Sequence, residues 1–423
     1  MSGYEASNGN WLAWSQVLAA FLVQICTLGL SNSFGVFQSY FEHDLLNSFS
    51  PSSIAWIGTT QGFLSSIFGI ISGPLYDKGY MKSLMYFGGA LNVAGLLCTS
   101  FAGQYSWVIL SYGIAIGLGS GALYVPSQAA IQTHFSPEKA AIPTGISMTG
   151  SSVGGIIYPI LFRQLESRFG FSWTCRAFAL INGVLLLTSC LLTRPRQSRQ
   201  LERNTSLQSF SWHAFYDWKL VLLGVCGLIL NIGVDVPFYF IPTFVQKKLG
   251  LSAGVGDSLL AGINASSLLG RIILNWLSGY STALITWQFS IIGACVLLFC
   301  WWIIRTLAGI IAFVILYGFL VGGLTSLIPS TIRELDPYSE VIGARIGVVD
   351  GFQGAGFLIG PPIAGAIMVT SAGYFGVSMF CGALYLFLFI LVGVLTYRRS
   401  KSSEEDDNEN TNVSNTQREE SST

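Results

Sequence analysis

The sequence predicts an all-α integral membrane protein with twelve transmembrane helices in two pseudo-symmetric six-helix bundles. Three observations support this fold class. The chain of 423 residues is 52% apolar and only 10% charged, whereas a soluble protein typically carries about 25% charged residues. Its apolar residues gather into runs long enough to cross a bilayer, which takes about 20 residues. Gly and Pro positions of the first half recur in the second half. Because backbone polar groups in lipid must be paired within the segment, the runs are expected to be helices.

Twelve apolar runs are candidate spans, six in each half of the chain. They cover roughly 11–37, 53–75, 83–102, 107–130, 142–162, 173–193, 219–244, 255–277, 284–304, 306–328, 343–369 and 374–397. We therefore expect an N-terminal six-helix bundle over 1–193, a polar cytosolic linker over 194–217 and a C-terminal six-helix bundle over 218–397. Residues 398–423 are acidic and rich in Ser and Asn, which predicts a disordered tail.

Basic residues predict the orientation, because Lys and Arg are enriched in cytosolic segments. If both termini are cytosolic, the inner segments hold Lys78, Lys82, Lys139, Arg194, Arg196, Arg199, Arg203, Lys219, Arg333, Arg398, Arg399 and Lys401. The outer segments then hold only Arg163, Arg168, Lys247, Lys248 and Arg305, with Arg176 near an edge. We therefore expect a multi-pass protein of the plasma membrane with both termini in the cytosol. The sequons at Asn204 and Asn412 should then stay unglycosylated.

An internal repeat relates the two halves. The fourth and tenth runs share a pattern in Tyr112-Gly113, Gly117 and Pro126-Ser127 against Tyr317-Gly318, Gly322 and Pro329-Ser330. The fifth and eleventh runs share another in Gly145, Gly154 and Pro159 against Gly347, Gly356 and Pro361. Gly and Pro are common in any packed membrane helix, but the shared offsets favour two bundles related by a pseudo-two-fold axis. A binding site is then expected between the bundles near mid-membrane.

The loop after the second run carries a motif, Gly73-Pro74-Leu75-Tyr76-Asp77-Lys78-Gly79-Tyr80-Met81-Lys82. Further motifs are Asn8-Gly9-Asn10-Trp11-Leu12-Ala13-Trp14, Asn32-Ser33-Phe34-Gly35-Val36-Phe37, the stretch from His134 to Gly155, Gly270-Arg271 and Gly360-Pro361-Pro362. Together they resemble the major facilitator superfamily and its monocarboxylate porter-like group, most of all the fungal branch. The resemblance covers nearly the whole chain except the tail. It implies the major facilitator fold and a secondary transporter that works by alternating access as a monomeric functional unit.

Two positions depart from the animal monocarboxylate carriers. Those carriers have a Lys where this chain has Asn32, and an Asp four residues before the eighth-helix Arg, where this chain has Ser267. Arg271 alone remains of the charged set implied for proton and carboxylate handling. A less charged cavity favours an amphipathic substrate, so we expect efflux of a small organic molecule, a fungal secondary metabolite. Uptake of a monocarboxylate or vitamin-like acid is the alternative, and a non-transporting membrane sensor is an alternative of another class.

The resemblance also implies a gate in the motif loop. In the superfamily the Asp at the position of Asp77 lies against the N-terminus of the eleventh helix, where the helix dipole favours an anion. Gly73 and Lys78 belong to the same motif, and Arg345 is placed to pair with Asp77. We therefore predict that Gly73, Asp77, Lys78 and Arg345 form a cytosolic gate. The competing interpretation is an ordinary solvated loop.

Three charges lie inside the predicted spans, where a charge is costly and therefore suggests a function. Helix rise places Arg271 and Asp350 both about 10 Å from the cytosolic end, so they can pair across a cavity. Arg271 can instead hold a substrate carboxylate by two parallel hydrogen bonds. Asp235 lies beside Pro237 in the outer half of the seventh run, where it can carry a proton. The alternative for each is a snorkelling or structurally paired charge.

Polar residues in the runs are further candidates for the cavity wall. They fall in the first, fourth, seventh and eighth runs, which line the cavity in the superfamily, and comprise Gln24, Asn32, Gln128, Asn231 and Asn264. Hydrogen bonding between helices is an equally good explanation for them.

Matches to enzyme and cofactor motifs are rejected because the residues around them do not predict the structure that each motif requires. Gly150-Ser151-Ser152-Val153-Gly154 matches G-x-S-x-G, but it lies in an apolar helix rather than a strand–turn–helix. The Gly-rich run at 117–121 lacks the Lys of a phosphate-binding loop. The three histidines are scattered and the eight cysteines form no CxxC pair. We therefore expect no catalytic residues, no metal, no cofactor and no nucleic-acid partner. The expected partners are the lipid bilayer, a small-molecule substrate and a coupling ion such as a proton.

Overall fold

The computed structural model describes residues 11–194, 217–337, 339 and 341–420. All regular secondary structure in these residues is helical. The N-terminal half contains α1 (Trp11–Gln24), η1 (Ile25–Gly29), α2 (Leu30–Asn32), α3 (Phe34–Tyr40), η2 (Phe41–Leu45), α4 (Pro51–Asp77), α5 (Met81–Thr99), α6 (Tyr105–Val108), η3 (Ile109–Ala115), α7 (Ile116–His134) and α8 (Ala141–Leu192). The C-terminal half contains α10 (Trp218–Val234), α11 (Val236–Leu249), α12 (Ala253–Leu277), α13 (Ala283–Cys300), η4 (Trp301–Ile303), α14 (Leu307–Ser326), α15 (Ile328–Leu335), α16 (Ile342–Met368) and α17 (Gly373–Glu420).

The described helices form twelve membrane-spanning segments. Eight stretches are long and apolar enough to cross a membrane by length and composition. One of these, Ala141–Leu192, counts as two spans, because its backbone leaves helical geometry at Gly170, where φ is +77°. The helices α5, α12 and α16, of 19, 25 and 27 residues, supply the other three. The predicted all-helical fold with twelve spans is therefore confirmed.

The repeat seen in the sequence corresponds to repeated helix packing. In each half, two glycines one turn apart on the fourth span press against backbone carbonyls of the second span. A Cβ on any of them would lie within 3.2 Å of the facing oxygen. The facing pairs are Gly113 with Ile57, Gly117 with Gln61, Gly318 with Ile263 and Gly322 with Ser267. The two halves are therefore two copies of one six-helix arrangement.

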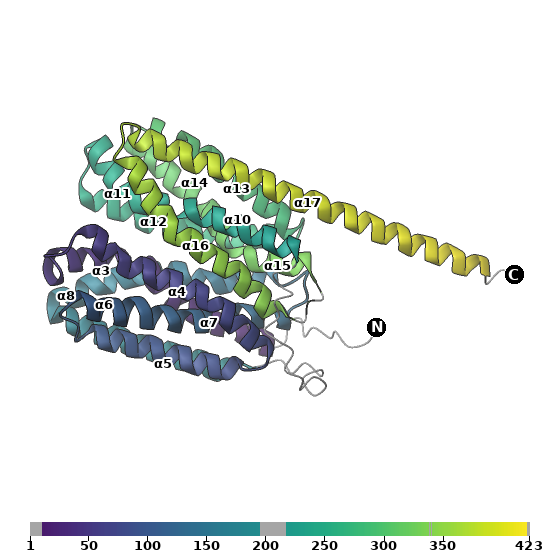
Figure 1. The fold of residues 1–423 in the computed structure, drawn as a ribbon, viewed down its shortest axis with the longest axis horizontal. Helices are drawn as coiled ribbons and strands as arrows, with labels where there is room; N and C mark the ends of the chain where they lie inside the picture. The colour runs from purple at the N-terminus through teal and green to yellow at the C-terminus, as the bar shows by residue number, and fades with distance from the viewer. Residues whose placement is uncertain (1–10, 195–216, 338, 340, 421–423) are drawn as a thin grey trace.

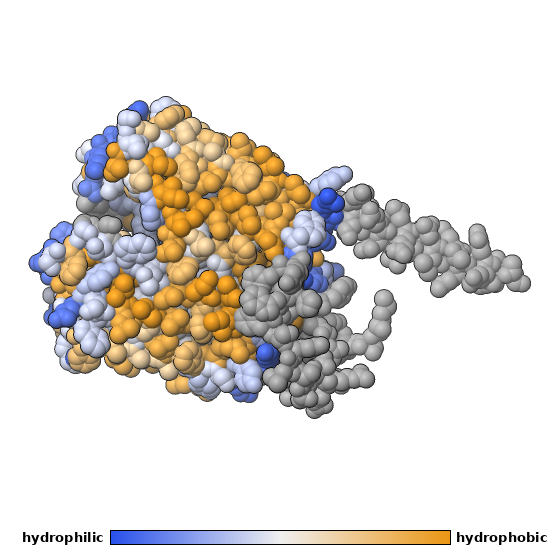
Figure 2. Space-filling view, viewed as in Figure 1, coloured by the Kyte–Doolittle hydropathy of each residue, from blue (hydrophilic) through white to orange (hydrophobic). Residues whose placement is uncertain are grey.

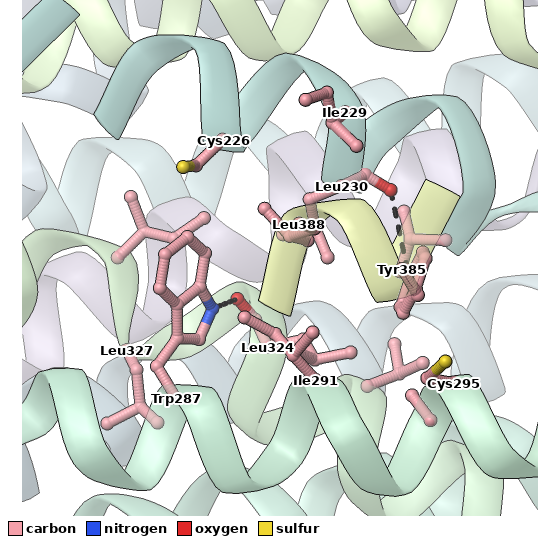
Figure 3. Close-up of a cluster of buried hydrophobic side chains, with 14 of the residues drawn as sticks. Cys226, Ile229, Leu230, Trp287, Ile291, Cys295, Leu324, Leu327, Tyr385 and Leu388 are labelled. Atoms are coloured by element: carbon pink, nitrogen blue, oxygen red, sulfur yellow. Dashed lines mark hydrogen bonds between the residues drawn. The ribbon is translucent and has the colours of Figure 1, made fainter. Parts of the chain in front are cut away.

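Each half has its own apolar core. In the N-terminal half, Phe37 contacts the rings of Tyr112, Phe162 and Phe178 at centroid distances of 5.0, 4.8 and 6.1 Å. In the C-terminal half, the indole nitrogen of Trp287 donates to the carbonyl of Leu324 at 2.9 Å (Figure 3). The buried Trp287 thus supplies apolar area while its indole nitrogen keeps a partner.

The outer surface fits a bilayer. Figure 2 shows a broad apolar band across the face of the helical body in view, with hydrophilic side chains gathered toward its two ends. Large apolar residues such as Leu180 and Phe289 are 71% and 58% exposed. In water such a surface would be an aggregation hazard, and in lipid it is solvated.

The two halves meet along two helix pairs, α4 with α16 and α8 with α12. In Figure 1 the N-terminal half (purple to blue) lies below the C-terminal half (teal to yellow), with α4 and α16 side by side between them. We call the side where α4 ends at Asp77 and α16 begins at Ile342 the terminal side. Because the number of spans is even, the first and last spans also have their chain ends there. The other side is called the cavity side.

The tail differs from expectation. We predicted that residues 398–423 are disordered, whereas α17 continues to Glu420 and projects from the helical body (Figure 1). Helix propagation is cooperative, so a long apolar helix can extend into the following residues without a new nucleation step. Most of the predicted linker, including Asn204, lies outside the described residues, and the exact boundaries of the two bundles stay predictions.

Candidate functional site

A cavity of about 1050 Å³ lies between the two halves and opens on the cavity side. Its wall comes from α3, η2 and α8 of one half and from α11, α12 and α16 of the other. A second, inner cavity of about 150 Å³ lies closer to the terminal side. Six residues line both cavities, and we call them the neck: Ser31, Asn32, Asp235, Phe238, Asn264 and Phe357.

Asn32 reaches the cavity because the first span is not a regular helix. The chain forms a π-helical turn over Ile25–Gly29 and leaves helical geometry at Ser33, where φ is −95° and ψ is 2°. Such turns are frequent at functional sites. Gly29 permits this course, since a Cβ there would lie 2.8 Å from the Cα of Gly154. Asn32 is consequently exposed inside a span that is otherwise mostly buried.

Asp235 lies at the corresponding break in the seventh span. Helix α10 ends at Val234 and α11 begins at Val236, because Pro237 has no N–H to continue the hydrogen-bond ladder. The hydroxyl of Tyr317 donates to the carbonyl of Val234 at 2.9 Å, which satisfies one acceptor at the break. No residue in the described part of the chain donates a hydrogen bond to the Asp235 carboxylate or pairs with it.

The repeat makes Asn32 and Asp235 equivalent. Gly154 packs against the first span at the carbonyl of Ile25, and its repeat mate Gly356 packs against the seventh span at the carbonyl of Leu228. Asn32 follows Ile25 by seven residues and Asp235 follows Leu228 by seven. The first helix of each half therefore presents a polar side chain at the equivalent position of the neck.

Asn264 completes the polar part of the neck from α12. A Cβ on Gly155 would lie 3.1 Å from the Asn264 side-chain oxygen and 3.3 Å from the Cβ of Asn32. Gly155 thus lets the two asparagines approach each other across the boundary between the halves. The Asn264 amide nitrogen donates to the carbonyl of Leu260 at 3.2 Å, which leaves its oxygen toward the neck.

Arg271 and Asp350 both line the inner cavity, but they form no ion pair with each other. The Arg271 guanidinium donates to the carbonyl of Met148 at 2.7 Å, and the Ser66 hydroxyl donates to Asp350. Tyr124 lies within electrostatic range of both charges. The predicted pairing across the cavity is therefore not made, because each charge is held at its own interface between the halves.

The other polar candidates divide between the cavity and the helix interior. Asn231 lines the inner cavity and donates to the side-chain oxygen of Gln353 at 3.3 Å. Gln24 and Gln128 are fully buried and line neither cavity. Both amide atoms of Gln128 lack a hydrogen-bond partner in the part of the chain that the structure describes.

The terminal side is closed by the predicted motif loop. The backbone N–H groups of Gly343 and Ala344, in the first turn of α16, donate to the two carboxylate oxygens of Asp77 at 2.9 and 2.7 Å. A Cβ on Gly73 would overlap the carbonyl oxygen of Gly343, so the two helices touch backbone to backbone. Unpaired N–H groups and the positive end of a helix dipole favour an anion at such a helix start. We call this contact the Asp77 clasp.

Arg345 pairs with other carboxylates than the predicted one. Its guanidinium lies 3.0 Å from Asp217 and 2.9 Å from Asp336. Asp77 already accepts two backbone hydrogen bonds, and the side chain of Arg345 leaves α16 in a different direction because each residue turns the helix by about 100°. Lys78 is exposed directly after the end of α4.

Sequence reasoning missed several residues of the site. Phe238 and Phe357 belong to the neck, yet an aromatic residue in an apolar run reads equally well as lipid-facing. Tyr124 was missed for the same reason. Asp217, by contrast, had a detectable signal, since an Asp directly before an apolar run is a typical helix cap, and its side chain accepts from the N–H of Lys219 at 3.0 Å.

Comparisons with known proteins agree with this geometry. The family model described as Major Facilitator Superfamily matches residues 17–344. The chain is 35% identical over 375 residues to the MFS-type transporter pynF of Aspergillus niger, covering 88% of this chain and 85% of that protein. It is 33% identical to the Aspyridones efflux protein apdF of Emericella nidulans, covering 90% and 77%, and 33% identical to the Fujikurins efflux protein of Gibberella fujikuroi, covering 90% and 81%.

Solved structures show the same fold. The crystal structure of the transporter FucP in the outward conformation matches with a TM-score of 0.72 at 14% identity, covering 90% of this chain and 99% of that one. This likeness agrees with the twelve-span fold described above. The chain therefore belongs to the Major Facilitator Superfamily, as a multi-pass membrane transporter and not an enzyme.

Proposed function

We propose that this transporter exports a small amphipathic organic molecule, a secondary metabolite, by alternating access, and that the structure corresponds to its outward-facing state. The observation that carries the proposal is one-sided access: the cavity of about 1050 Å³ opens only on the cavity side, while Asp77 holds α16 on the terminal side. Relatives named as efflux proteins for aspyridones, fujikurins and agnestins support export rather than uptake.

Charge along the chain supports an orientation with both termini in the cytosol. Among the described residues, the terminal-side segments hold at least eight basic residues, whereas the cavity side holds six. The eight are Lys78, Lys82, Lys139, Arg194, Lys219, Arg333, Arg398 and Arg399, and the six are Arg163, Arg168, Arg176, Lys247, Lys248 and Arg305. With this orientation, the clasp is the cytosolic gate and the cavity faces outside. An exporter of metabolites belongs in the plasma membrane, and one chain is the functional unit because it contains the whole cavity.

The charges of the outer cavity favour export over uptake of an acid. Its described lining includes one arginine, Arg163, and four carboxylates, Glu42, Asp44, Glu166 and Asp235. A wall with this excess of negative charge lowers the local concentration of anions that arrive from outside. Membership of the monocarboxylate porter-like group and uptake of a vitamin-like acid are therefore the weaker alternative, supported by the motifs and by Arg271.

The coupling ion is proposed to be a proton. Asp235 lies at the neck without a partner among the described residues, and Asp350 lies in the inner cavity beside Ser66. A carboxylate that meets water in one state and lies dry in another can bind a proton on one side and release it on the other. Arg271, held by Met148, is placed to bias this exchange electrostatically.

Deletion of the gene in the source organism tests the proposal. Metabolites are compared between culture medium and cells by mass spectrometry, with wild-type and Asp77→Asn genes returned to the deletion strain. We expect at least one metabolite to move from medium to cells on deletion, and to return with the wild-type gene. An unchanged distribution of every detected metabolite would support the sensor alternative. Accumulation of an external carboxylic acid only in the wild type would support uptake.

A further inference from the structure

Two aromatic rings of the outer cavity pack against glycines of α4. Gly58 and Gly62 are four residues, about 6 Å along the helix axis, apart on the same face of α4. A Cβ on Gly58 would overlap the ring of Phe34, and a Cβ on Gly62 would overlap the ring of Phe357. Phe34 belongs to the N-terminal half and Phe357 to the C-terminal half, and both line the outer cavity. The glycines thus let one flat ring from each half lie close to α4.

The aromatic residues of the cavity differ in whether another aromatic ring packs against them. Phe34 is backed by Tyr112 at 5.5 Å, and Tyr40 is stacked on Phe171 at 4.5 Å and 8°. In the described part of the chain, no ring contact joins Phe238 or Phe357 to another aromatic residue, although both line the neck. A planar conjugated ligand can therefore lie against these two rings, as aromatic groups do in offset-stacked or edge-to-face geometry.

The polar groups of the neck favour a ligand that forms hydrogen bonds over a ligand that carries a negative charge. Asp235 offers an acceptor with no partner among the described residues, the Asn264 oxygen is a second acceptor, and the Asn32 amide offers a donor. No described residue of the neck carries a positive charge. The cation of the inner cavity, Arg271, is 6% exposed and donates to Met148. An anionic ligand at the neck would face Asp235 without compensation.

From this arrangement we propose that the neck binds a planar conjugated ring whose edge carries an N–H or O–H donor beside a carbonyl group, with no negative charge. The ring lies against Phe357 and Phe238. Its donor binds Asp235, and its carbonyl accepts from Asn32. The inference rests on the proposed function, because it names the class of molecule that the exporter carries, but its test measures binding rather than export.

Equilibrium binding to the full chain in lipid nanodiscs tests the ligand class. The probe is tritiated 2-quinolone, a planar lactam with an N–H donor and a carbonyl. Its competitors are N-methyl-2-quinolone, which lacks the donor, decahydro-2-quinolone, which lacks the plane, and quinoline-2-carboxylate, which is an anion. We expect 2-quinolone to compete about tenfold better than the methylated lactam, because a hydrogen bond to a carboxylate is lost. Loss of ring contacts should weaken the saturated lactam about two- to tenfold.

Variants test which residue causes the preference for a planar ring and which causes the preference for a hydrogen-bond donor. Phe357→Leu should reduce the preference for the planar lactam to about twofold or less and leave the donor preference intact. Asp235→Ala should remove the donor preference, and Asp235→Asn should reduce it in part, since a neutral amide oxygen accepts a weaker hydrogen bond. Phe289→Leu, on the lipid-facing surface, is the matched control with both preferences unchanged. Each variant is first checked for a monodisperse elution profile.

The outcomes separate this inference from the proposed function. Equal affinity for planar and saturated lactams, no saturable binding of either, or strongest binding of the carboxylate overturns the inference, whether or not export is seen. A clear preference for the planar donor-bearing lactam that depends on Phe357 and Asp235 supports it. If that preference is found in a chain whose deletion shifts no metabolite, the inference stands and the proposed function fails.

Discussion

The two interfaces that join the halves use corresponding helices but different chemistry. Between α4 and α16, the backbones touch at Gly73 with Gly343 and at Gly69 with Gly347, and Asp77 caps the start of α16. Between α8 and α12 the backbones also touch, at Gly145 with the carbonyl of Arg271, and no charged cap is added. Instead the hydroxyls of Ser152 and Ser267 lie 2.9 Å apart and Arg271 donates to the carbonyl of Met148. The segment 278–282 after α12 contains no acidic residue that could cap α8 in the same way.

This difference indicates which of the two interfaces controls the change between conformations. Gly145 and Gly347 correspond in the repeat, and three residues beyond them lie Met148 and Asp350, each of which contacts the opposite half. The repeat therefore supplies two matching interfaces with a cation on one and an anion on the other. Only the α4–α16 interface adds a charged cap to a helix start, so we expect the α4–α16 pair to control the cytosolic gate and the α8–α12 pair to act as a pivot.

The largest effect is expected from a methyl group in the α4–α16 crossing. A Cβ on Gly347 would overlap the carbonyl oxygen of Gly69, and a backbone atom cannot rotate away. Overpacking of this kind costs about 1–3 kcal/mol, which corresponds to a shift of about 5- to 150-fold between conformations. Gly347→Ala should therefore nearly abolish export in the complemented deletion strain. Gly365→Ala is the control on the same helix, because nothing lies within 4 Å of its Cβ; equal losses in both variants would contradict the account.

Removal of the charge from the clasp should have the next largest effect. Asp77→Asn keeps the shape but replaces two charge-assisted hydrogen bonds to Gly343 and Ala344 with weaker ones. We expect export to fall about tenfold while the amount of protein at the cell surface stays near wild type. Glu138→Gln, an exposed acid in the loop before α8, should leave export unchanged. If the Asp77→Asn variant exports as well as the wild type, the Asp77 clasp is not part of the gate.

A smaller effect is expected at Arg345. Its guanidinium joins Asp217, at the end of the linker, to Asp336, in the loop before α16. The pairs are partly exposed, so each is worth about 1 kcal/mol or less. Arg345→Lys should reduce export about two- to threefold, since Lys cannot reproduce both contacts. An effect as large as that of Asp77→Asn would mean that Arg345 belongs to the clasp itself.

The smallest effect is expected at the α8–α12 interface. Ser267→Ala removes the neutral hydrogen bond between Ser267 and Ser152, and a neutral hydrogen bond is typically worth about 1 kcal/mol. Ser267 also donates to the carbonyl of Asn264 at 3.0 Å. Export should stay within about threefold of wild type. A loss comparable to that of Gly347→Ala would show that the two interfaces share control of the gate.

Residue patterns predicted the fold better than the site. Hydropathy predicted the spans and the paired glycines predicted the repeat. Both patterns can be found in the sequence without knowledge of the tertiary contacts. Asn32, Asp235 and Asn264 could be proposed because polar groups in lipid are rare. Gln128 met the same criterion, yet it is buried outside both cavities, since the direction in which a side chain leaves its helix depends on tertiary packing.

Contacts between distant segments could not be predicted in the same way. Phe357 reaches the neck because Gly62, on another helix, leaves room for its ring. Arg345 pairs with Asp217, which is 128 residues away in sequence, rather than with Asp77. Both results depend on how the two halves dock, a property that single-helix periodicity does not encode.

Thiol accessibility tests the central claim of one-sided access most directly. Cysteine is introduced at Ser258, which lines the outer cavity, or at Ser330, which is 7% exposed on the terminal side, in a parent with the exposed Cys98 and Cys300 replaced by serine. In intact cells, a membrane-impermeant maleimide should label Ser258→Cys rapidly. In inside-out vesicles, Ser330→Cys should react slowly, and about tenfold faster once Asp77→Asn releases the clasp. Slow labelling of Ser258→Cys from outside, or an Asp77→Asn variant that leaves Ser330→Cys unreactive, would contradict the account.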